Sequence, residues 1–270
     1  MIDLTVAERF IEAGGHRLKC TTLGQPDPAR PTLVFLHEGL GSISMWKDYP
    51  AQVAEQVGLP VLMYDRWGHG ESDPLTEPRK PSYRRVEALE VLPEVLAQFP
   101  VGPMILIGHS DGGAMSLLYA ASHPQRVLGI VGLAPQVGKP RQSAPVAAGA
   151  SGAMQAVINA FEKGELKRRL ERYHGANTER MFYGWANAWS SPEFAGWQMS
   201  EELRQIRAPV VVIQGDRDPY GYRHNIEALE QDLAAPLAVH IHPEAGHIPH
   251  HEARDFTLEH TARAIRAFTA

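Results

Sequence analysis

The segment that most constrains this chain is Gly-His-Ser-Asp-Gly at residues 108–112, which directly follows an apolar run at residues 103–107. A G-x-S-x-G sequence between a strand and a helix forms a sharp turn in which the serine hydroxyl stands clear of the backbone. The run before it is typical of a buried strand, and the small residues at 114–121 are typical of a closely packed helix. This context predicts a strand, a turn that exposes Ser110 and a helix, rather than a loop with an incidental serine.

The rest of the chain alternates between short apolar runs and segments with helical spacing. Strands are predicted at residues 32–36, 61–64, 104–107, 127–133, 210–213 and 238–241, after an N-terminal hairpin at residues 10–22. Helices are predicted at residues 46–57, 83–99 and 114–121, and from about residues 225 and 256. Continuously apolar strands need cover on both faces, so the pattern predicts an α/β fold with a mostly parallel central sheet flanked by helices.

Residues 138–204 interrupt this alternation because they contain no convincing strand. They begin with a passage rich in Gly, Pro, Ala and Ser and continue as helical segments rich in charge and tryptophan. We expect a helical lid inserted into a core formed by residues 1–137 and 205–270. Such a lid would cover the carboxyl edge of the sheet, where open α/β sheets bind their ligands.

Length, charge and cysteine content limit the classes of protein to which this chain can belong. Its 270 residues are enough for one large α/β domain or two small ones. The net charge of -5 argues against nucleic acid or an anionic membrane as the main partner, and no apolar stretch could span a bilayer. The single cysteine, Cys20, excludes an internal disulfide, and the first residues lack the basic and apolar regions of a signal peptide. The expected setting is cytoplasmic, and the expected partner is a small-molecule substrate.

Two later segments offer the base and the acid that a nucleophilic serine requires. Asp216 and Asp218 follow the apolar run at residues 210–213, and His247 follows the run at residues 238–241. A serine hydroxyl becomes a nucleophile only when a base takes its proton and a third group orients that base. The carboxyl ends of parallel strands meet at one edge of a sheet, so we expect these groups to converge with Ser110 there.

Four further motifs resemble those of the α/β-hydrolase superfamily, and together they span essentially the whole chain. Leu-His-Glu-Gly-Leu-Gly-Ser at residues 36–42 is similar to the oxyanion-loop motif. Tyr-Asp-Arg-Trp-Gly-His-Gly-Glu-Ser at residues 64–72 is similar to the D-x-x-G-x-G-x-S turn. Gly-Asp-Arg-Asp at residues 215–218 resembles the G-x-x-D acid motif, and Gly-His at residues 246–247 resembles the histidine loop. The chain therefore resembles the serine-nucleophile branch of the superfamily.

The resemblance assigns a role to each catalytic candidate. It implies that Ser110 is the nucleophile, His247 the base and Asp218 the orienting acid. Asp216 is the alternative acid, although it falls two residues early for the motif. Within the turn at residues 64–72, the resemblance makes the aspartate a structural residue.

The same resemblance implies an oxyanion hole formed by the backbone N–H groups of Gly39 and Asp111. Leu40 remains an alternative to Gly39, because Glu38 stands where the superfamily usually has glycine. Arg66, which lies in the D-x-x-G-x-G-x-S turn, is interpreted as a turn residue rather than an anion clamp.

A serine at position 110 excludes the branches of this superfamily whose nucleophile is aspartate. We expect a serine hydrolase that cleaves a small carboxylic ester or lactone through an acyl-enzyme on Ser110, without a cofactor. A C–C bond hydrolase of ring-cleavage products and a thioesterase are the alternatives among enzymes. A ligand receptor that retains the fold is the alternative outside enzymes.

Several side chains are candidates for contact with the substrate. Glu38 and Asp111 flank the predicted oxyanion donors and could hold a substrate ammonium group. The preferred interpretation is that both hydrogen-bond within the protein, because a carboxylate there opposes developing negative charge. Trp185, Trp189 and Tyr220 are possible substrate-binding residues, with helix packing as the alternative for the tryptophans.

Histidines are concentrated near the C-terminus, where His-Ile-Pro-His-His occupies residues 247–251. This cluster lacks H-E-x-x-H or another ligand spacing, so the sequence predicts no metal site. The basic stretch at residues 163–172 is interpreted as the solvated face of a helix.

Overall fold

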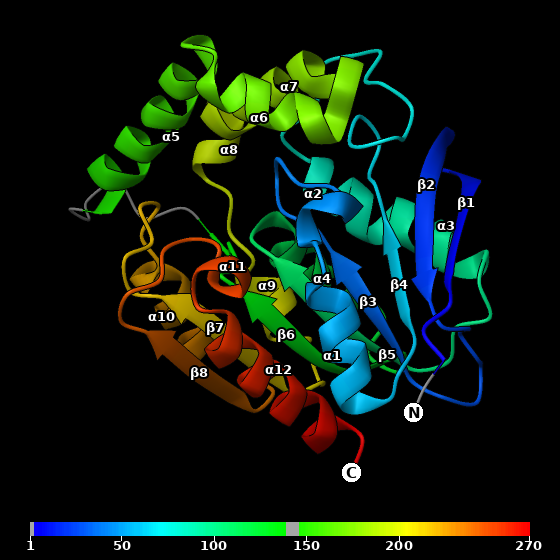
Figure 1. Ribbon diagram of the computed structural model, residues 1–270. Coiled ribbons are helices and arrows are strands. Elements are labelled where there is room, and N and C mark those ends of the chain that lie inside the picture. Colours follow the sequence, from blue (N-terminus) through cyan, green and yellow to red (C-terminus); the bar gives the residue numbers. More distant parts are fainter. Residues whose placement is uncertain (1–2, 139–145) are drawn as a thin grey trace.

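The computed structural model describes residues 3–138 and 146–270 and contains a single eight-stranded sheet (Figure 1). The strand order is β1-β2-β4-β3-β5-β6-β7-β8, in which β1–β2 and β2–β4 pair antiparallel and the other neighbours pair parallel. The strands are β1 (Val6–Ala13), β2 (His16–Leu23), β3 (Thr32–Leu36), β4 (Val61–Tyr64), β5 (Met104–His109), β6 (Val127–Leu133), β7 (Val210–Gly215) and β8 (Leu237–His242). The predicted mostly parallel sheet is confirmed.

Helices cover both faces of the sheet. One face is covered by α1 (Tyr49–Val57), α11 (Pro249–Glu252) and α12 (Arg254–Phe268). The other face is covered by α2 (Tyr83–Val86), α3 (Leu92–Ala97), α4 (Asp111–Ser122), α9 (Ser200–Leu203) and α10 (Arg223–Asp232). None of the helices in the described ranges 3–138 and 146–270 is long and apolar enough to cross a membrane.

The central strands are continuously apolar because their two sides face two different hydrophobic clusters. In β5, Met104 and Leu106 join the cluster under α4, whereas Ile105 and Ile107 join the cluster under α1 and α12. Successive side chains of a strand point to opposite faces, so a strand with cover on both sides buries every residue. Burial on both faces of the sheet therefore explains the continuously apolar runs that predicted parallel strands.

Two predicted helices are interrupted. Within predicted helix 46–57, α1 is preceded by a 3-10 turn, η1 (Ile43–Trp46), and the chain turns at Lys47, where φ is 54°. Predicted helix 83–99 contains a π-helical turn, η2 (Glu87–Val91), between α2 and α3. Pro93 at the start of α3 has no N–H to donate to the preceding turn, which accounts for the wider turn.

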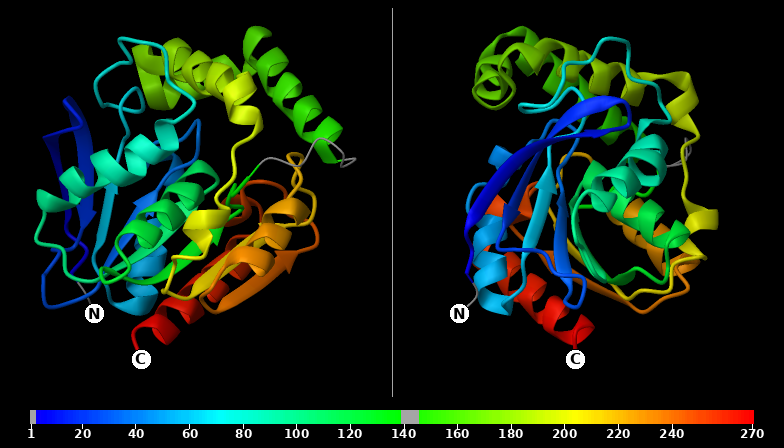
Figure 2. Two further views of the ribbon diagram at one scale, coloured as in Figure 1. Left: turned by 180° about the vertical axis from the view of Figure 1, so that it is seen from behind. Right: turned by 90° about the vertical axis from the view of Figure 1, so that its right-hand side faces the viewer.

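Between β6 and β7 the chain forms helices that lie beyond the carboxyl edge of the sheet (Figures 1 and 2). They are α5 (Val146–Glu162), α6 (Glu165–His174), η3 (Gly175–Asn177), α7 (Thr178–Ser190) and α8 (Pro192–Ala195). Phe161 of α5 and Phe182 of α7 stack with ring centroids 3.7 Å apart, which joins the first and last long helices of this group. Residues 139–145 of the predicted insertion lie outside the described residues.

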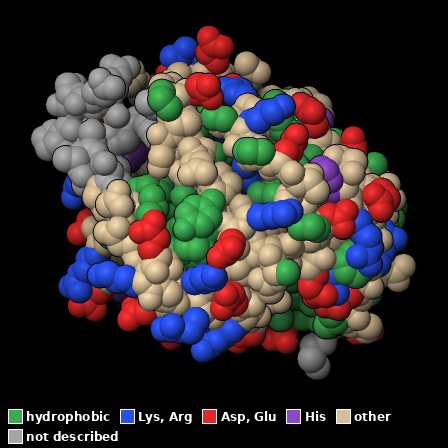
Figure 3. All heavy atoms as spheres, turned by 90° about the horizontal axis from the view of Figure 1, so that it is seen from above, with side chains coloured by type: hydrophobic (Ala, Val, Ile, Leu, Met, Phe, Trp, Pro, Cys, Tyr) green, Lys and Arg blue, Asp and Glu red, His purple; other side chains and the backbone are tan. Residues whose placement is uncertain are grey.

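Charged side chains of both signs are mixed over the face of the molecule that carries these helices (Figure 3). The basic stretch at residues 163–172 contributes to this mixture, because Lys163 before α6 and Arg168 and Arg172 within it are exposed. Lys167 of the same stretch forms an ion pair with Glu179 at 2.5 Å. The basic residues of α6 therefore face solvent for the most part.

Candidate active site

Ser110 lies at the turn between β5 and α4 with φ 52° and ψ -110°. A positive φ is uncommon for a residue with a side chain, and such strain concentrates at functional sites. The flanking glycines are required by close backbone approach. A Cβ atom on Gly108 would lie 2.2 Å from the Gly112 carbonyl oxygen, and one on Gly112 would lie 1.9 Å from the Leu36 carbonyl oxygen. The Gly-His-Ser-Asp-Gly sequence thus permits a turn that a bulkier sequence could not form.

The loops after β7 and β8 bring an acid and a histidine to this serine. His247 Nε2 lies 2.9 Å from Ser110 Oγ, and His247 Nδ1 lies 2.7 Å from Asp218 Oδ2. Asp216, the alternative acid, instead accepts a hydrogen bond from the Tyr222 hydroxyl. Serine, histidine and aspartate therefore form one continuous hydrogen-bonded chain, and Asp218 is its acid.

Asp218 is held in place by contacts besides the one with His247. Its Oδ2 also accepts a hydrogen bond from Gln214 Nε2 at 3.0 Å, and its Oδ1 accepts one from the Tyr220 N–H at 2.9 Å. Burial opposes the charged form of Asp218, but the His247 ring and the hydrogen bonds outweigh it and lower the pKa of Asp218. The carboxylate is thus ionised and fixed against the imidazole.

The pKa of His247 is raised, whereas that of Asp218 is lowered. Burial alone would lower the pKa of His247, but the charge and hydrogen bond of Asp218 outweigh burial and raise it above its ordinary value. The charges of Glu38 and Asp111 act in the same direction. This arrangement stabilises the imidazolium form that His247 would adopt after taking a proton from Ser110.

His109, the variable residue before Ser110, supports the histidine loop. Its Nε2 lies 2.7 Å from the carbonyl oxygen of His247, and burial lowers the pKa of His109 to about 3. The ring is therefore neutral near pH 7 and donates its proton to that carbonyl. Strand β5 thus leads into Ser110 and also supports the backbone of His247.

The loop after β3 passes beside the turn that carries Ser110. The N–H of Leu40 donates to Glu38 Oε2 at 2.6 Å, whereas the N–H of Gly39 has no hydrogen-bond acceptor among residues 3–138 and 146–270. A Cβ atom on Gly39 would lie 2.2 Å from Trp185 Nε1 and 2.9 Å from Asp111 Oδ2. Gly39 therefore fits closely against the turn at Ser110, and unlike the N–H of Leu40 its N–H is not bonded to a protein acceptor in the described part of the chain.

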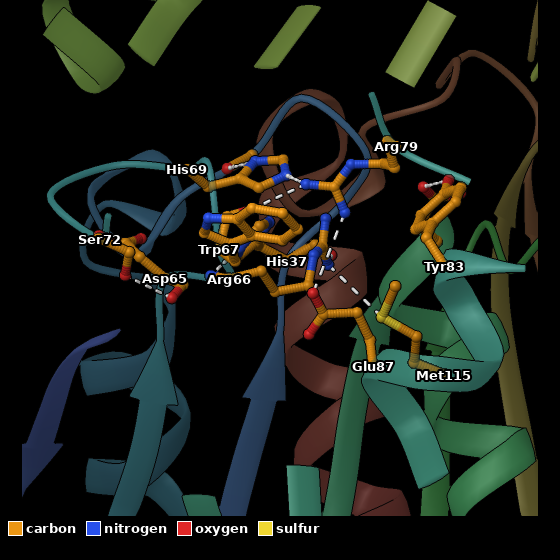
Figure 4. Close-up of polar contacts among 12 residues, drawn as sticks. His37, Asp65, Arg66, Trp67, His69, Ser72, Arg79, Tyr83, Glu87 and Met115 are labelled. Carbon is orange, nitrogen blue, oxygen red and sulfur yellow. Dashed lines mark hydrogen bonds and ion pairs between the residues drawn. The ribbon is translucent and has the colours of Figure 1, made fainter. Parts of the chain in front are cut away.

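Arg66 holds this loop from behind. Its Nη1 donates to the His37 carbonyl oxygen at 2.6 Å, and its Nη2 donates to the Glu38 carbonyl oxygen at 2.7 Å. Figure 4 shows the buried guanidinium between His37 and Met115, whose sulfur lies 3.6 Å from Nη1. Arg66 belongs to the turn, as the sequence predicts, and its contacts show that it also joins the turn to the loop after β3.

Asp65, next to it, accepts hydrogen bonds from the N–H groups of Ile43 and Glu71 at 2.7 and 3.2 Å, and Ser72 Oγ donates to its carbonyl oxygen at 2.6 Å. Figure 4 includes Asp65 and Ser72. These contacts fix the turn at residues 64–72 and leave Asp65 no contact with the serine–histidine–aspartate chain.

The carboxylate of Asp111 faces the protein interior. It forms an ion pair with Arg84 and accepts a hydrogen bond from the Tyr83 hydroxyl. Burial opposes the charged form of Asp111, but Arg84 outweighs it and lowers the pKa of Asp111. The preferred interpretation of Asp111, hydrogen bonding within the protein, matches this geometry. No local sequence signal marks Arg84 as its partner, because the pair is 27 residues apart.

A cavity of about 270 Å³ opens onto the serine and histidine side chains. Its walls come from the loops at the strand ends and from helices α5, α6 and α7. The lining residues are Glu38, Gly39, Leu40, Met45, His109, Ser110, Gln136, Val157, Leu166, Arg169, Leu170, Tyr173, Trp185, Trp189, Tyr220, His247 and Ile248. The structure thus places all four possible substrate-binding residues, Glu38, Trp185, Trp189 and Tyr220, at this cavity.

His174 at the end of α6 does not line the cavity but joins the helices to the core. Its Nδ1 accepts a hydrogen bond from the Gly70 N–H at 2.9 Å, and its Nε2 donates to the Leu40 carbonyl oxygen at 2.9 Å. Asn177 beside it donates to the Ser72 carbonyl oxygen at 2.8 Å. These contacts fasten the α6–α7 corner to the oxyanion loop and to the turn at residues 64–72.

The histidines near the C-terminus pack in two places, one around His240 and one around His250, which contacts the rings of His109 and His251. His240 stacks on His260 with ring centroids 3.8 Å apart, and His250 packs against Trp46 at 4.7 Å. In the part of the chain that the structure describes, no group of three or more His, Cys, Asp or Glu side chains is arranged to hold a metal ion.

Comparisons with known proteins agree with this fold. The proline iminopeptidase of Lactobacillus delbrueckii subsp. bulgaricus is 28% identical over 129 residues, which are 47% of this chain and 43% of that protein. The monoglyceride lipase of Rattus norvegicus is 30% identical over 131 residues, which are 47% of this chain and 42% of that protein. The matched region therefore spans less than half the length of these relatives.

Solved structures share this fold over nearly the whole chain. The 2-hydroxy-6-oxo-6-phenylhexa-2,4-dienoate hydrolase from Rhodococcus sp. strain RHA1 superimposes with a TM-score of 0.75 and 19% identity. The superposition covers 97% of this chain and 99% of that one, and it shows a shared fold. Residues 33–259 also match the alpha/beta hydrolase family. The chain therefore belongs to the alpha/beta hydrolase family.

Proposed function

We propose that this protein is a serine hydrolase that cleaves a small carboxylic ester or lactone through an acyl-enzyme on Ser110. The observation that carries the proposal is the hydrogen-bonded chain from Ser110 through His247 to Asp218, which opens into a cavity. The similarity to a monoglyceride lipase and to proline iminopeptidases supports acyl transfer to water. The cavity volume of about 270 Å³ favours a small substrate, since ligand pockets commonly range from about 300 to 1,000 Å³.

In the first half of the reaction, His247 takes the proton of Ser110 while Oγ attacks the carbonyl carbon. The backbone N–H groups of Asp111 and Gly39 hold the oxyanion that forms. Gly39 is favoured over Leu40 as the second donor because the Leu40 N–H is already bonded to Glu38. His247 then gives its proton to the departing alcohol oxygen, which leaves the acyl group on Ser110.

In the second half, His247 takes a proton from a water molecule that attacks the acyl-enzyme. The new tetrahedral intermediate uses the same two N–H groups, and its collapse returns the proton to Ser110 as the acid departs. Asp218 keeps the imidazole in the tautomer that presents Nε2 to the serine. The reaction needs no group beyond substrate and water.

Helices α5 to α8 act in this proposal as a lid over the catalytic residues. Support comes from the lining of the cavity, to which Trp185 and Trp189 of α7 contribute large apolar surfaces. Rings of this kind shield an acyl group from water and strengthen electrostatic interactions with the oxyanion. The aromatic wall favours acyl groups that are themselves apolar or aromatic.

A fluorophosphonate probe tests this function without knowledge of the natural substrate. Such a probe phosphonylates an activated serine, so peptide mapping of the labelled protein identifies the nucleophile. We expect one label, on Ser110, and none on the Ser110→Ala variant. Ser116→Ala is a matched control because Ser116 lies in the same helix and is buried. Labelling of another serine, or of none, would contradict the proposal.

A further inference from the structure

Glu38 contributes a carboxylate to the wall of the cavity that also contains Ser110 and His247. Among the described residues that line this cavity, no other residue is acidic. Arg169 is the basic residue of the lining, and its side chain is exposed at the α6 wall. Glu38 is therefore the acidic side chain that shares this cavity with the candidate nucleophile.

The carboxylate of Glu38 lacks a counter-ion. Its Oε2 accepts a hydrogen bond from the Leu40 N–H at 2.6 Å, but no Lys, Arg or His nitrogen of residues 3–138 and 146–270 forms an ion pair with it. The guanidinium of Arg66 contacts the backbone carbonyl oxygen of Glu38, not its side chain. Burial raises the pKa of Glu38, as expected for a carboxylate that has lost hydration without gaining a cationic partner.

Asp111, the neighbouring acidic residue, differs from Glu38 because its charge is paired with a cation. Asp111 also borders the oxyanion loop, and it is paired with Arg84 and hydrogen-bonded by Tyr83. The chain thus pairs the carboxylate of Asp111 with a cation, whereas the carboxylate of Glu38 has a hydrogen bond from the Leu40 N–H but no cationic partner among the described residues. A partly buried carboxylate without a counter-ion becomes more favourable when a ligand supplies the opposite charge.

We propose that Glu38 selects substrates that carry a cationic amine near the scissile carbonyl, such as esters of amino acids. The substrate class rests on the proposed function of Ser110. The ammonium group donates a hydrogen bond to the Glu38 carboxylate and supplies the missing counter-ion. Its positive charge also offsets the repulsion between Glu38 and the oxyanion, which a neutral ester would leave uncompensated.

Two benzyl esters with the same carbon skeleton test this inference. The benzyl ester of L-valine carries an α-ammonium group at about pH 6, whereas benzyl 3-methylbutanoate carries hydrogen there. We expect kcat/KM to be higher for the valine ester by about ten- to a hundredfold, the effect of one hydrogen bond to a charged group. A wild-type enzyme that favours the neutral ester would overturn the inference.

The informative variant is Glu38→Gln, which keeps an oxygen acceptor for the Leu40 N–H and removes the charge. We expect the ratio of kcat/KM for the valine ester to that for the neutral ester to fall by at least about tenfold. Glu201→Gln, an exposed glutamate outside the cavity, should leave the ratio unchanged. If Glu38→Gln lowers both rates equally, Glu38 only shapes the loop and the inference is wrong.

Binding to the Ser110→Ala variant separates this inference from the proposed function. Calorimetry should show that Ser110→Ala binds L-valine benzyl ester at least about tenfold more tightly than the Ser110→Ala, Glu38→Gln double variant. This result together with an absence of turnover by the wild type would contradict the hydrolase proposal and support cation selection. Equal affinities would overturn cation selection whatever the turnover.

Discussion

The Arg84 guanidinium is ion-paired with the Asp111 carboxylate, and both side chains are only 1% exposed. The centre of the guanidinium also lies 4.8, 4.9 and 4.5 Å from the rings of Trp189, Phe194 and Trp197. These aromatic residues belong to the helical segment between β6 and β7, whereas Asp111 begins α4 directly after Ser110. The ion pair therefore connects the proposed lid to the nucleophile turn.

Replacement of Arg84 by Met should destabilise the protein by about 3 to 5 kcal/mol, because it leaves a buried carboxylate without its partner. The free energy of unfolding in urea measures this loss. The double variant Arg84→Met, Asp111→Asn should recover part of it, since the buried charge is then gone. A single variant as stable as the wild type would show that the pair contributes little.

Arg66→Lys should lower kcat while leaving KM nearly unchanged. A lysine has no planar fork with which to reach both carbonyl oxygens, so the loop that carries Gly39 loses one of its two restraints. Complete loss of one oxyanion donor costs about 10²- to 10³-fold in rate, and we expect about tenfold or more from its displacement. Steady-state kinetics on a p-nitrophenyl ester measure the change.

Arg217→Lys is a suitable control because the Arg217 side chain is 68% exposed. The control should behave as the wild type in the same assay. An Arg66→Lys enzyme with wild-type kcat would indicate that the turn holds the oxyanion loop without this guanidinium.

The fold was largely predictable because its determinants are local. Apolar runs such as residues 104–107 are buried on both sides in the parallel sheet, so the runs marked the strands. The π-helical turn before Pro93 could not be predicted, because one extra residue in a helix changes the spacing of its apolar residues too little to be recognised in the sequence.

The candidate site was predictable only where a motif fixes spacing along the chain. Ser110, Asp218 and His247 each follow a strand, and the parallel sheet brings them together. Arg84 and His174 could not be found in this way. Each meets its partner through tertiary packing over a long separation in sequence, and a buried arginine or histidine resembles a surface one when only the sequence is known.

Stability should fall on acidification through His174. Its two hydrogen bonds require a neutral ring, and burial lowers its pKa to about 4, so the unfolded chain binds more protons between about pH 6.5 and pH 4. The unfolding free energy attributable to His174 therefore decreases as pH falls through this window, by about 3 kcal/mol in total. Urea unfolding at several pH values measures it.

His174→Gln is the comparison for this measurement, because an amide can still accept from Gly70 and donate to Leu40 but does not titrate. The difference in unfolding free energy between wild type and variant should change with pH over that window. Parallel curves would show that His174 does not contribute to the acid sensitivity.

The pH dependence of kcat/KM should report His247. The base must be neutral to accept the Ser110 proton, so activity falls as pH decreases through its pKa, which the charge of Asp218 raises above the ordinary histidine value against the effect of burial. Glu38 also raises this pKa. The Glu38→Gln variant should therefore keep its activity to a lower pH than the wild type. If the acid side of the kcat/KM profile is the same in Glu38→Gln and the wild type, the charge of Glu38 does not affect the pKa of His247.

The central claim is that Ser110 becomes covalently acylated during turnover. Rapid-mixing kinetics with p-nitrophenyl esters of increasing acyl length test it most directly, because the acyl-enzyme releases p-nitrophenol before it reacts with water. We predict a burst of p-nitrophenol equal to the concentration of active enzyme, and its complete loss in Ser110→Ala. A burst that persists in Ser110→Ala, or no release of p-nitrophenol from any ester in the series, would contradict the account.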